Sequence, residues 1–505
     1  MPAALAIDQS TSATKALLFD EAGRVAARVS REHRQYYPEP GWVEHDAEEI
    51  WQNVLATATE LLQQTGTGAD DLACISIANQ RETIVVFEKG SGKPLHPAIV
   101  WQCRRSEALC AEHVAAGDGD DVHARTGLRI DPYFSGSKLQ WLARNCPELW
   151  ARVANGEALI GTVDAYLVYR MTEGRVFATD VTNASRTLLF DAGALSWSDE
   201  LCELWQVPPG ALPEVRESEA GYGETTLAGA LSRPVPVCGV MGDSQAALFA
   251  QRCFEPGTAK VTFGTGSSVL LNIGSDFRLS GSGVLTALGW VRNGTPVYAL
   301  EGIIISSAAT LAWLENQLGL VENVAEIERL AREIPDAGGV FLVPAFSGLG
   351  LPYWAPDARA AIIGLSAHSD RRHVARAALE SMAYQLRDAL DALQSDGGVT
   401  LRSLRADGGP TANRLLMQMV ADLTQSRLTV ASASDCSALG AALMGFLGTG
   451  VYTSLDALAA LPADDVQYEP DATPADAQAR QDAWRTAVSR VLSGPARQPK
   501  GETDS

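Results

Sequence analysis

Two short tracts of small residues, each following an apolar run, have the composition of phosphate-binding turns. The first spans residues 8–15 and the second spans residues 264–266. Their possible donors are Ser10, Thr11, Ser12 and Lys15 in the first tract and Gly264, Thr265 and Gly266 in the second. Small residues let backbone N–H groups converge on an anion, and hydroxyl and ammonium groups add donors. Either tract alone is also typical of a polar turn, but two that face each other would clamp the phosphate chain of a nucleotide.

Two aspartates stand where carboxylate chemistry is expected. Asp8 follows the apolar residues 5–7 and adjoins the first tract. Because Mg²⁺ binds through one or two carboxylates together with water, Asp8 is a candidate ligand of a magnesium–phosphate complex. Asp243 lies between the apolar segment 234–242 and an alanine-rich segment. From this segment alone, a helix N-cap is the favoured interpretation of Asp243 and a catalytic carboxylate is the alternative.

A third loop, residues 406–413, carries the paired glycines Gly408 and Gly409 and ends at Asn413. Glycines placed directly after a strand let a flat ring or a phosphate approach the backbone closely. A tight turn without any ligand is the alternative.

The elements that must position these loops alternate between strands and helices. Apolar strands flank each tract, and period-two or continuous apolar patterns predict strands at 73–79 and 83–87. Helical periodicity predicts helices at 47–64, 371–393 and 412–425. This mixture favours an α/β fold. The repeated strand–tract–strand pattern suggests two related halves divided after residue 248, although chance similarity between turns would give the same pattern.

Composition restricts the partners. The chain has 505 residues and a net charge of 40 − 61 = −21, which argues against nucleic acid because a polyanion needs a surplus of Lys and Arg. No segment reaches the roughly 18 apolar residues of a membrane helix, and the N-terminus has no signal-peptide pattern, so we expect no membrane insertion and a cytoplasmic location. Eight cysteines without a C-x-x-C motif suggest neither a zinc site nor a disulfide framework.

Several segments together resemble the FGGY carbohydrate kinases of the actin/Hsp70/hexokinase superfamily, and most of all the members that phosphorylate glycerol. Among them are HRQYYPEPGWVEHD, ISIANQRETIVVF, DPYFSGSK, FGTGSS and ADGGPTANRLLMQ. The resemblance implies an α/β fold of two ribonuclease-H-like domains flanking a deep catalytic cleft. It implies an N-terminal domain over 1–248 and a C-terminal domain over 249–493. Polar composition predicts disorder for the tail, 494–505.

The resemblance also implies roles for individual residues. Asp243 matches the catalytic base, and Asp8 together with Asp243 matches the magnesium-associated carboxylates. The polyol pocket is matched by Arg81, Glu82, Trp101, Tyr133 and Asp243, with Ser244 and Ser268 at neighbouring positions. ATP is expected on Ser10, Thr11, Ser12, Lys15, Gly264, Thr265, Gly266, Gly408, Gly409 and Asn413.

Five positions depart from the pattern of the glycerol-phosphorylating members. Ser244 replaces a Gln, Ser268 replaces a Phe and Cys103 replaces an Asp. If Ser244 and Ser268 face the substrate, the pocket gains room and polar capacity; alternatively, glycerol binds there with added water. Ala308 and Ala312 replace a Gly and a Gln that help to hold the adenosine. The loop 228–234 lacks the Gly-x-Arg pattern of fructose-bisphosphate control, so that regulation is not expected.

We therefore expect an ATP- and Mg²⁺-dependent kinase for a terminal hydroxyl of a small polyol, with glycerol as the leading substrate and a homodimer or homotetramer as the assembly. The alternative within the family is a kinase for a four- or five-carbon polyol or ketose, such as erythritol, threitol, xylulose or ribulose. The alternative from another class is a non-catalytic, nucleotide-dependent scaffold or sugar sensor. The polyol-pocket residues disfavour the scaffold, and the negative net charge disfavours a DNA-binding sugar sensor.

Overall fold

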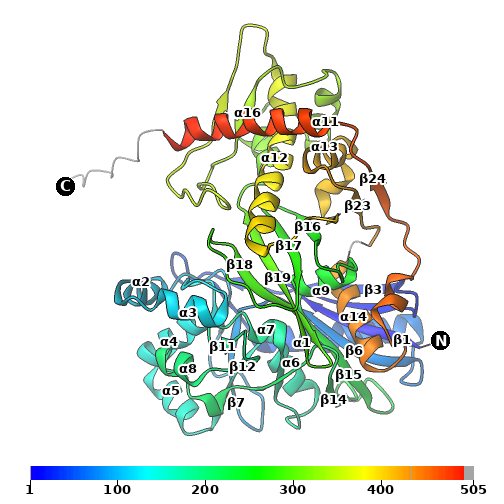
Figure 1. Ribbon diagram of the computed structural model, residues 1–505. Coiled ribbons are helices and arrows are strands. Elements are labelled where there is room, and N and C mark those ends of the chain that lie inside the picture. Colours follow the sequence, from blue (N-terminus) through cyan, green and yellow to red (C-terminus); the bar gives the residue numbers. More distant parts are fainter. Residues whose placement is uncertain (1, 434, 494–505) are drawn as a thin grey trace.

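The structure is a computed structural model that describes residues 2–433 and 435–493. The tail predicted to be disordered, 494–505, lies outside the described residues. Two large sheets form the two halves of the molecule, the first in the lower half of Figure 1 and the second running into the upper half.

The first sheet has the order β14-β15-β6-β1-β2-β3. Its strands are β1 (Ala3–Gln9), β2 (Ala13–Phe19), β3 (Val25–Glu32), β6 (Leu72–Asn79), β14 (Gly221–Thr225) and β15 (Val235–Gly242). β1 pairs antiparallel with β2 and parallel with β6, and β6 pairs parallel with β15. β1 and β6 are almost fully buried, which explains their continuous apolar sequences.

The second sheet has the order β18-β19-β17-β16-β22-β23-β24. Its strands are β16 (Thr258–Phe263), β17 (Ser267–Gly274), β18 (Leu285–Arg292), β19 (Thr295–Ile304), β22 (Ser403–Asp407), β23 (Leu428–Val430) and β24 (Val466–Tyr468). Here β16 pairs antiparallel with β17 and parallel with β22, as β1 does with β2 and β6. The two sheets therefore share the same pairing of their central strands, and differ at the edge where β17 pairs with β19 rather than with the next strand, β18. The predicted α/β fold of two sheet-based halves is confirmed.

Helices cover both sheets. The helices used below are α1 (Ala47–Thr65), α4 (Ser135–Asn145), α7 (Val181–Ala184), α9 (Asp243–Ala250), α10 (Ala308–Asn316), α12 (Arg371–Gly397), α13 (Arg414–Thr424), α14 (Cys436–Gly448) and α16 (Pro474–Leu492). Helix α1 shows why the sequence predicts such elements: the Asp46 side chain accepts hydrogen bonds from two backbone N–H groups of the first turn, and Gly66 ends the helix in the left-handed conformation.

Helix α14 returns from the second half of the chain to the first sheet. Its apolar residues, such as Ala441 and Met444, share a core cluster with Ala4 and Leu17, and Figure 1 shows the helix in orange beside β1, β6 and β15. The predicted domain boundary after residue 248 falls inside α9 and stays a prediction. Within the described residues, no helix combines the length and apolar character needed to cross a membrane.

Candidate active site

The first predicted phosphate loop is the turn between β1 and β2. The hydroxyl of Ser10 donates to the carbonyl of Ala13 at 2.9 Å and closes the turn. Ser12 is exposed. The Thr11 hydroxyl accepts a hydrogen bond from the indole Nε1 of Trp101 at 2.9 Å. This turn is therefore joined to a residue predicted to bind polyol.

Asp8, at the end of β1, lies in a cluster of charged groups. Lys15 donates to its carboxylate at 3.0 Å and lies 3.6 Å from a carboxylate oxygen of Asp435. Burial raises the pKa of Asp8, Lys15 opposes this shift, and the carboxylates of Asp243 and Asp435 add to it. Several carboxylates are thus gathered around one ammonium group.

The second loop is fixed by the start of α10. The N–H of Gly264 donates to the carbonyl of Gly266 at 2.9 Å within the loop. The N–H groups of Ala308 and Ala309 donate to the carbonyls of Gly264 and Thr265 at 3.0 and 3.1 Å. This bracing aligns the loop with the helix that follows β19.

The third loop depends on a glycine conformation. Gly408 has φ +98° and ψ 164°, and a Cβ atom there would collide with the carbonyl of Phe263. Gly409 has open space on the corresponding side. Asn413 caps α13 by accepting from the N–H of Leu416 at 2.9 Å.

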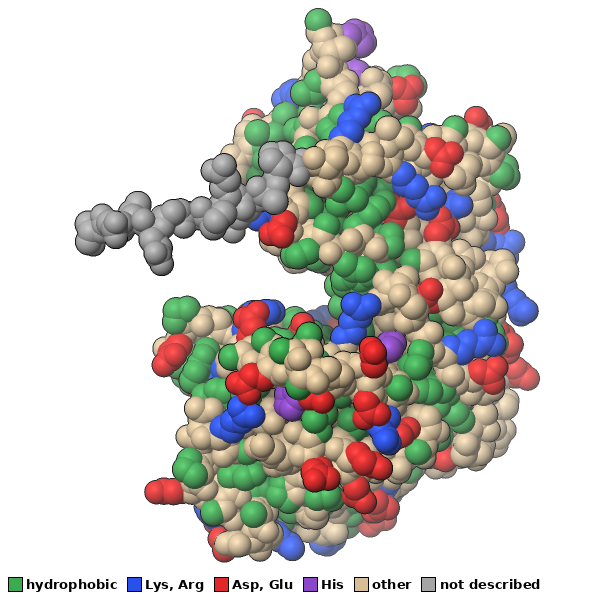
Figure 2. Space-filling view, turned by 60° about the vertical axis from the view of Figure 1, so that its left-hand side comes forward, with side chains coloured by type: hydrophobic (Ala, Val, Ile, Leu, Met, Phe, Trp, Pro, Cys, Tyr) green, Lys and Arg blue, Asp and Glu red, His purple; other side chains and the backbone are tan. Residues whose placement is uncertain are grey.

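Two cavities are lined in part by residues of the second loop. A cavity of about 870 Å³ is lined by Thr265, Gly409 and Asn413, and by Ala308 and Ala312. A second cavity, of about 570 Å³, is lined by Gly264 and Gly266 together with residues from both halves of the chain. Figure 2 shows the deep hollow between the halves. A phosphate chain lying across residues 264–266 would connect the two cavities.

The smaller cavity, here called the polyol cavity, collects the predicted polyol-binding residues. Its lining includes Thr11, Arg81, Glu82, Trp101, Tyr133, Asp243, Ser244, Lys260, Ser268 and Glu301. The rings of Trp101 and Tyr133 meet edge to face with centroids 5.4 Å apart. Residues that are more than 160 positions apart in the sequence thus share one cavity.

A buried ionic network lies beside this cavity. Arg81 lies 3.1 Å from Glu301, and Arg186 lies 2.6 Å from Glu82 and 2.7 Å from Glu301. Burial opposes ionisation of Glu301, but Arg186 and Arg81 outweigh it and lower its pKa to about 2. Burial raises the pKa of Glu82 in spite of Arg81 and Arg186.

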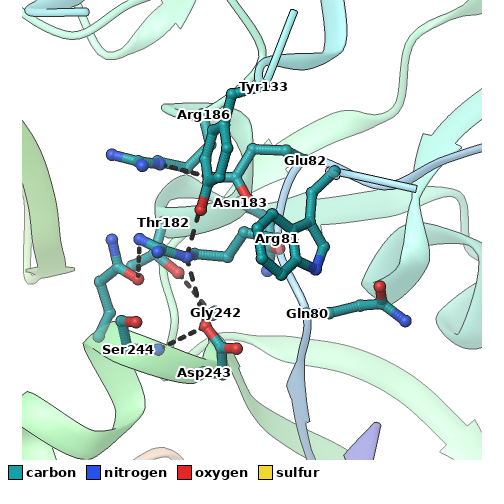
Figure 3. A network of polar contacts seen from close by, with 12 residues as sticks. Gln80, Arg81, Glu82, Tyr133, Thr182, Asn183, Arg186, Gly242, Asp243 and Ser244 are labelled. Carbon is teal, nitrogen blue, oxygen red and sulfur yellow. Dashed lines mark hydrogen bonds and ion pairs between the residues drawn. The ribbon is translucent and has the colours of Figure 1, made fainter. Parts of the chain in front are cut away.

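Asp243 is the first residue of α9, and the N-cap is Gly242. The N-cap interpretation of Asp243 is therefore wrong by one position, because the chain enters the helix through the glycine. The carboxylate accepts from the N–H of Ser244 at 2.6 Å and lies 3.3 Å from Nε of Arg81. Its side chain is 38% exposed, so it remains accessible from the cleft. Figure 3 shows Arg81 and Asp243 pointing toward one another, with Ser244 beside them.

Ser268 faces the polyol cavity. It pairs in register with Thr262 on β16 and Ile303 on β19, and all three side chains line the cavity. Its Oγ is buried and has no hydrogen-bond partner among the described residues. A buried hydroxyl without a partner is unfavourable unless water or a ligand satisfies it.

The family models for carbohydrate kinases match most of the chain. The N-terminal domain of the FGGY family of carbohydrate kinases matches residues 3–250, and its C-terminal domain matches residues 259–449. The chain belongs to this family. The predicted family and the expected class of enzyme, an ATP-dependent carbohydrate kinase, are confirmed.

Similar proteins cover nearly the whole kinase. A glycerol kinase of Shewanella sp. (strain ANA-3) is 44% identical over 97% of this chain and 99% of its own length. Glycerol kinase 1 of Thermotoga maritima is 43% identical, again over 97% of this chain and 99% of its own length. The crystal structure of Plasmodium falciparum glycerol kinase with ADP is 34% identical and superposes with a TM-score of 0.93 over 98% of this chain and 99% of that one.

Three residues of the site were missed by the sequence analysis: Lys260, Glu301 and Arg186. Lys260 and Glu301 line the polyol cavity, and Arg186 lies behind it. Lys260 and Glu301 interrupt the otherwise mainly apolar strands β16 and β19. A charge inside a buried strand is rare unless it is paired, and this signal could have identified both.

Proposed function

We propose that this kinase transfers the γ-phosphoryl group of ATP to a terminal hydroxyl of glycerol and forms glycerol 3-phosphate. The observation that carries the proposal is the shared cavity: Arg81, Glu82, Trp101, Tyr133 and Asp243 line one space beside the second phosphate loop. The glycerol kinases at 43–44% identity over nearly the full length support the same substrate.

The cavity provides the groups that a small polyol needs. Arg81 offers a hydrogen-bond donor and Glu82 an acceptor for neighbouring hydroxyls, while Trp101 and Tyr133 provide apolar walls for the carbon chain. A substrate held in this way would present one terminal hydroxyl to Asp243.

Asp243 is the proposed general base. Its exposed carboxylate takes the proton of the attacking hydroxyl as that oxygen bonds to the γ-phosphorus and the bond to the β-phosphate bridging oxygen breaks. The contact with Arg81 fixes the direction of the carboxylate before the substrate arrives.

ATP is proposed to lie with its phosphates along residues 264–266 and its adenosine in the larger cavity. Ser10, Thr11, Ser12 and Lys15 approach the phosphates from the first half, and Gly408, Gly409 and Asn413 border the nucleoside. Because Ala308 and Ala312 have no polar side-chain atoms, they contribute only apolar contacts to the adenosine.

The charged residues fit a bound Mg²⁺. No group of three or more His, Cys, Asp or Glu residues in the described part of the chain could hold a metal unaided, but Mg²⁺ needs only one or two carboxylates when phosphates and water complete its shell. Asp8 and Asp243 would hold it, and the charge gathered around Asp8 suits a cation. When bound, the ion neutralises charge on the phosphates.

Closure of the cleft is part of the proposal. The polyol cavity has walls from both halves and opens into the cleft, so water can reach Asp243 in this conformation. Movement of the halves toward each other would exclude that water and favour transfer to the polyol over hydrolysis of ATP.

A four- or five-carbon polyol or ketose is the second candidate substrate. The buried, unpartnered Oγ of Ser268 favours it, because an additional substrate hydroxyl could satisfy this atom. Ser244 lines the same cavity and adds further polar capacity.

A coupled assay with ATP and Mg²⁺ tests the proposal over glycerol, dihydroxyacetone, erythritol, threitol, xylulose, ribulose and xylitol. The highest kcat/KM on glycerol would support the leading candidate, and an optimum on a longer substrate would support the second. ATP-dependent turnover of none of these compounds would contradict both.

We also propose a cytoplasmic location, where ATP is abundant, and assembly into a homodimer or homotetramer. Cell fractionation would test the location, and gel filtration with light scattering would test the assembly.

A further inference from the structure

Arg186 lies directly behind the polyol cavity without lining it. Its side chain is completely buried in the segment that follows α7. Its Nε donates to Oε1 of Glu82 at 2.6 Å, a contact that Figure 3 shows from close by. Its guanidinium also lies over the rings of Tyr133 and Phe134, at 5.9 and 5.2 Å from their centroids.

The backbone of Glu82 has an unusual conformation. Glu82 has φ +62°, in the left-handed region that non-glycine residues rarely adopt. Its carbonyl is held by the hydroxyl of Ser135 at 2.9 Å. Such strained conformations persist only where surrounding contacts determine them, and they are concentrated at functional sites.

Two arginines, Arg81 and Arg186, contact the carboxylate of Glu82. Arg81 lies 3.9 Å from the Glu82 carboxylate and also contacts Asp243 and Glu301, whereas Arg186 contacts Glu82 more closely, at 2.6 Å. The other charged or titratable groups that act on Glu82 are Glu301, Tyr133 and Lys138. Arg186 is therefore the nearer of the two arginines and the one that donates a hydrogen bond to the Glu82 carboxylate, although Arg81 also acts on the charge of Glu82 and Arg186 also lies 2.7 Å from Glu301.

We propose that Arg186 is a positioning residue that holds the Glu82 carboxylate toward the polyol cavity as a hydrogen-bond acceptor, while Arg81 remains available to the substrate and to Asp243. This inference rests on the proposed polyol-binding role of Glu82. Arg186 itself does not touch the substrate.

Loss of Arg186 should weaken polyol binding through Glu82. Burial already raises the pKa of Glu82, and without Arg186 the neutral acid becomes still more favourable. A neutral carboxyl group accepts hydrogen bonds less strongly, so the defect should increase as the pH falls.

The test compares Arg186→Met and Arg186→Lys with the wild type on the best substrate of the panel. Arg186→Met should raise the KM for polyol by about 10- to 100-fold, the range expected for loss of a charge-assisted hydrogen bond. The KM for ATP should stay within about twofold, since a charge-assisted contact is lost only on the polyol side. The KM of Arg186→Met for polyol should decrease as the pH rises from 6 to 8.5. The conservative variant Arg186→Lys should restore part of the affinity for polyol.

Two controls separate positioning from general destabilisation. Arg376→Met removes a partly buried arginine that lies 3.0 Å from Glu380 in α12 and does not line the polyol cavity, so it should leave the KM for polyol unchanged. In a double-mutant cycle, Arg186→Met should add much less to Glu82→Gln than it does to the wild type, and the remainder is expected from its second contact, with Glu301. If Arg186→Met fails to fold, the same cycle is made with Arg186→Lys.

An unchanged KM for polyol in a folded Arg186 variant would overturn the inference, and so would a defect that adds fully to that of Glu82→Gln. Calorimetric binding of the polyol is measured alongside. A wild type that binds polyol but transfers no phosphoryl group would contradict the proposed function while leaving the inference testable by binding. A wild type that binds no polyol would contradict both.

Discussion

The guanidinium Nε of Arg81 lies 3.3 Å from a carboxylate oxygen of Asp243. The residue proposed to bind a substrate hydroxyl thus also contacts the residue proposed to take its proton. The Arg81 guanidinium also forms an ion pair with Glu301 at 3.1 Å and donates a hydrogen bond to the side-chain oxygen of Gln245 at 3.3 Å. Because Glu301 belongs to β19, the second half of the chain helps to set the geometry of the proposed base.

Asp243→Asn should abolish phosphoryl transfer and largely preserve polyol binding. The amide cannot take the proton, and general-base catalysis typically contributes about 10²- to 10⁴-fold. Single-turnover kinetics measure the transfer, and calorimetry measures the binding. Turnover within about tenfold of the wild type would show that another group is the base.

Asp8→Asn should raise the Mg²⁺ concentration needed for half-maximal activity, because one of the two proposed carboxylate ligands is lost. The KM for polyol should be unaffected. Activity is measured over a Mg²⁺ series at saturating ATP, with chelation by EDTA as the zero point. A Mg²⁺ dependence identical to that of the wild type would exclude Asp8 as a ligand.

Ser268→Phe should shift the substrate preference toward glycerol. The phenyl ring fills part of the 570 Å³ cavity and removes the unpartnered hydroxyl. The ratio of kcat/KM for glycerol to that for erythritol or xylulose should increase by about tenfold or more, which corresponds to roughly 1–3 kcal/mol of discrimination in a pocket. Ser268→Ala is the matched control, since it removes the hydroxyl without filling space. No change in the ratio would show that Ser268 does not set specificity.

Gly408→Ala should destabilise the fold and raise the KM for ATP. Its backbone conformation is almost exclusive to glycine and costs about 1–3 kcal/mol for other residues, and the new Cβ would also meet the carbonyl of Phe263. Gly409→Ala is the matched control because its Cβ would meet open space. Chemical unfolding of both variants provides the comparison of stability, and ATP kinetics are measured for Gly408→Ala against the wild type. Equal stability of the two variants would refute this explanation.

Lys138 should make stability depend on pH. Its ammonium group is buried and donates to the carbonyls of Pro132 and Tyr133, and burial lowers its pKa from 10.5 to about 8. Between pH 8 and 10.5, Lys138 is protonated in the unfolded chain but mostly neutral in the folded protein. Because the unfolded state binds more protons in this range, the free energy of unfolding increases as the pH rises. Relative to Lys138→Met, the wild type should gain up to about 1.4 kcal/mol in free energy of unfolding per pH unit above pH 8. Denaturation at pH 7, 8.5 and 9.5 measures this difference, and a constant difference would contradict the low pKa.

Local sequence patterns predicted the main elements well. The helix predicted at 47–64 is α1, and those predicted at 371–393 and 412–425 are α12 and α13 with ends shifted by a few residues. These helices have clear apolar periodicity. The N-cap position at Asp243 was predicted wrongly, because Asp and Gly are both common at helix starts and only the backbone angles distinguish them.

The buried ionic network could not be predicted in the same way. Arg186 and Glu301 are 115 positions apart, and the sequence analysis assigned no role to either residue. Their pairing depends on how the two sheets are placed relative to each other, and local periodicity carries no information about that placement.

The sequence by itself determined the class of elements, the three loops suited to phosphate and nucleoside, and the residues that resemble a polyol pocket. Each of these depends on local backbone preferences or on side-chain chemistry within a few residues. Only the tertiary structure decided that Ser268 faces the polyol cavity with an unpartnered hydroxyl, that α14 packs on the first sheet, and that Glu301 joins Arg81 to Arg186. These relationships arise from the packing of distant segments into a shared interior, where burial and charge pairing act between residues that the chain order keeps apart.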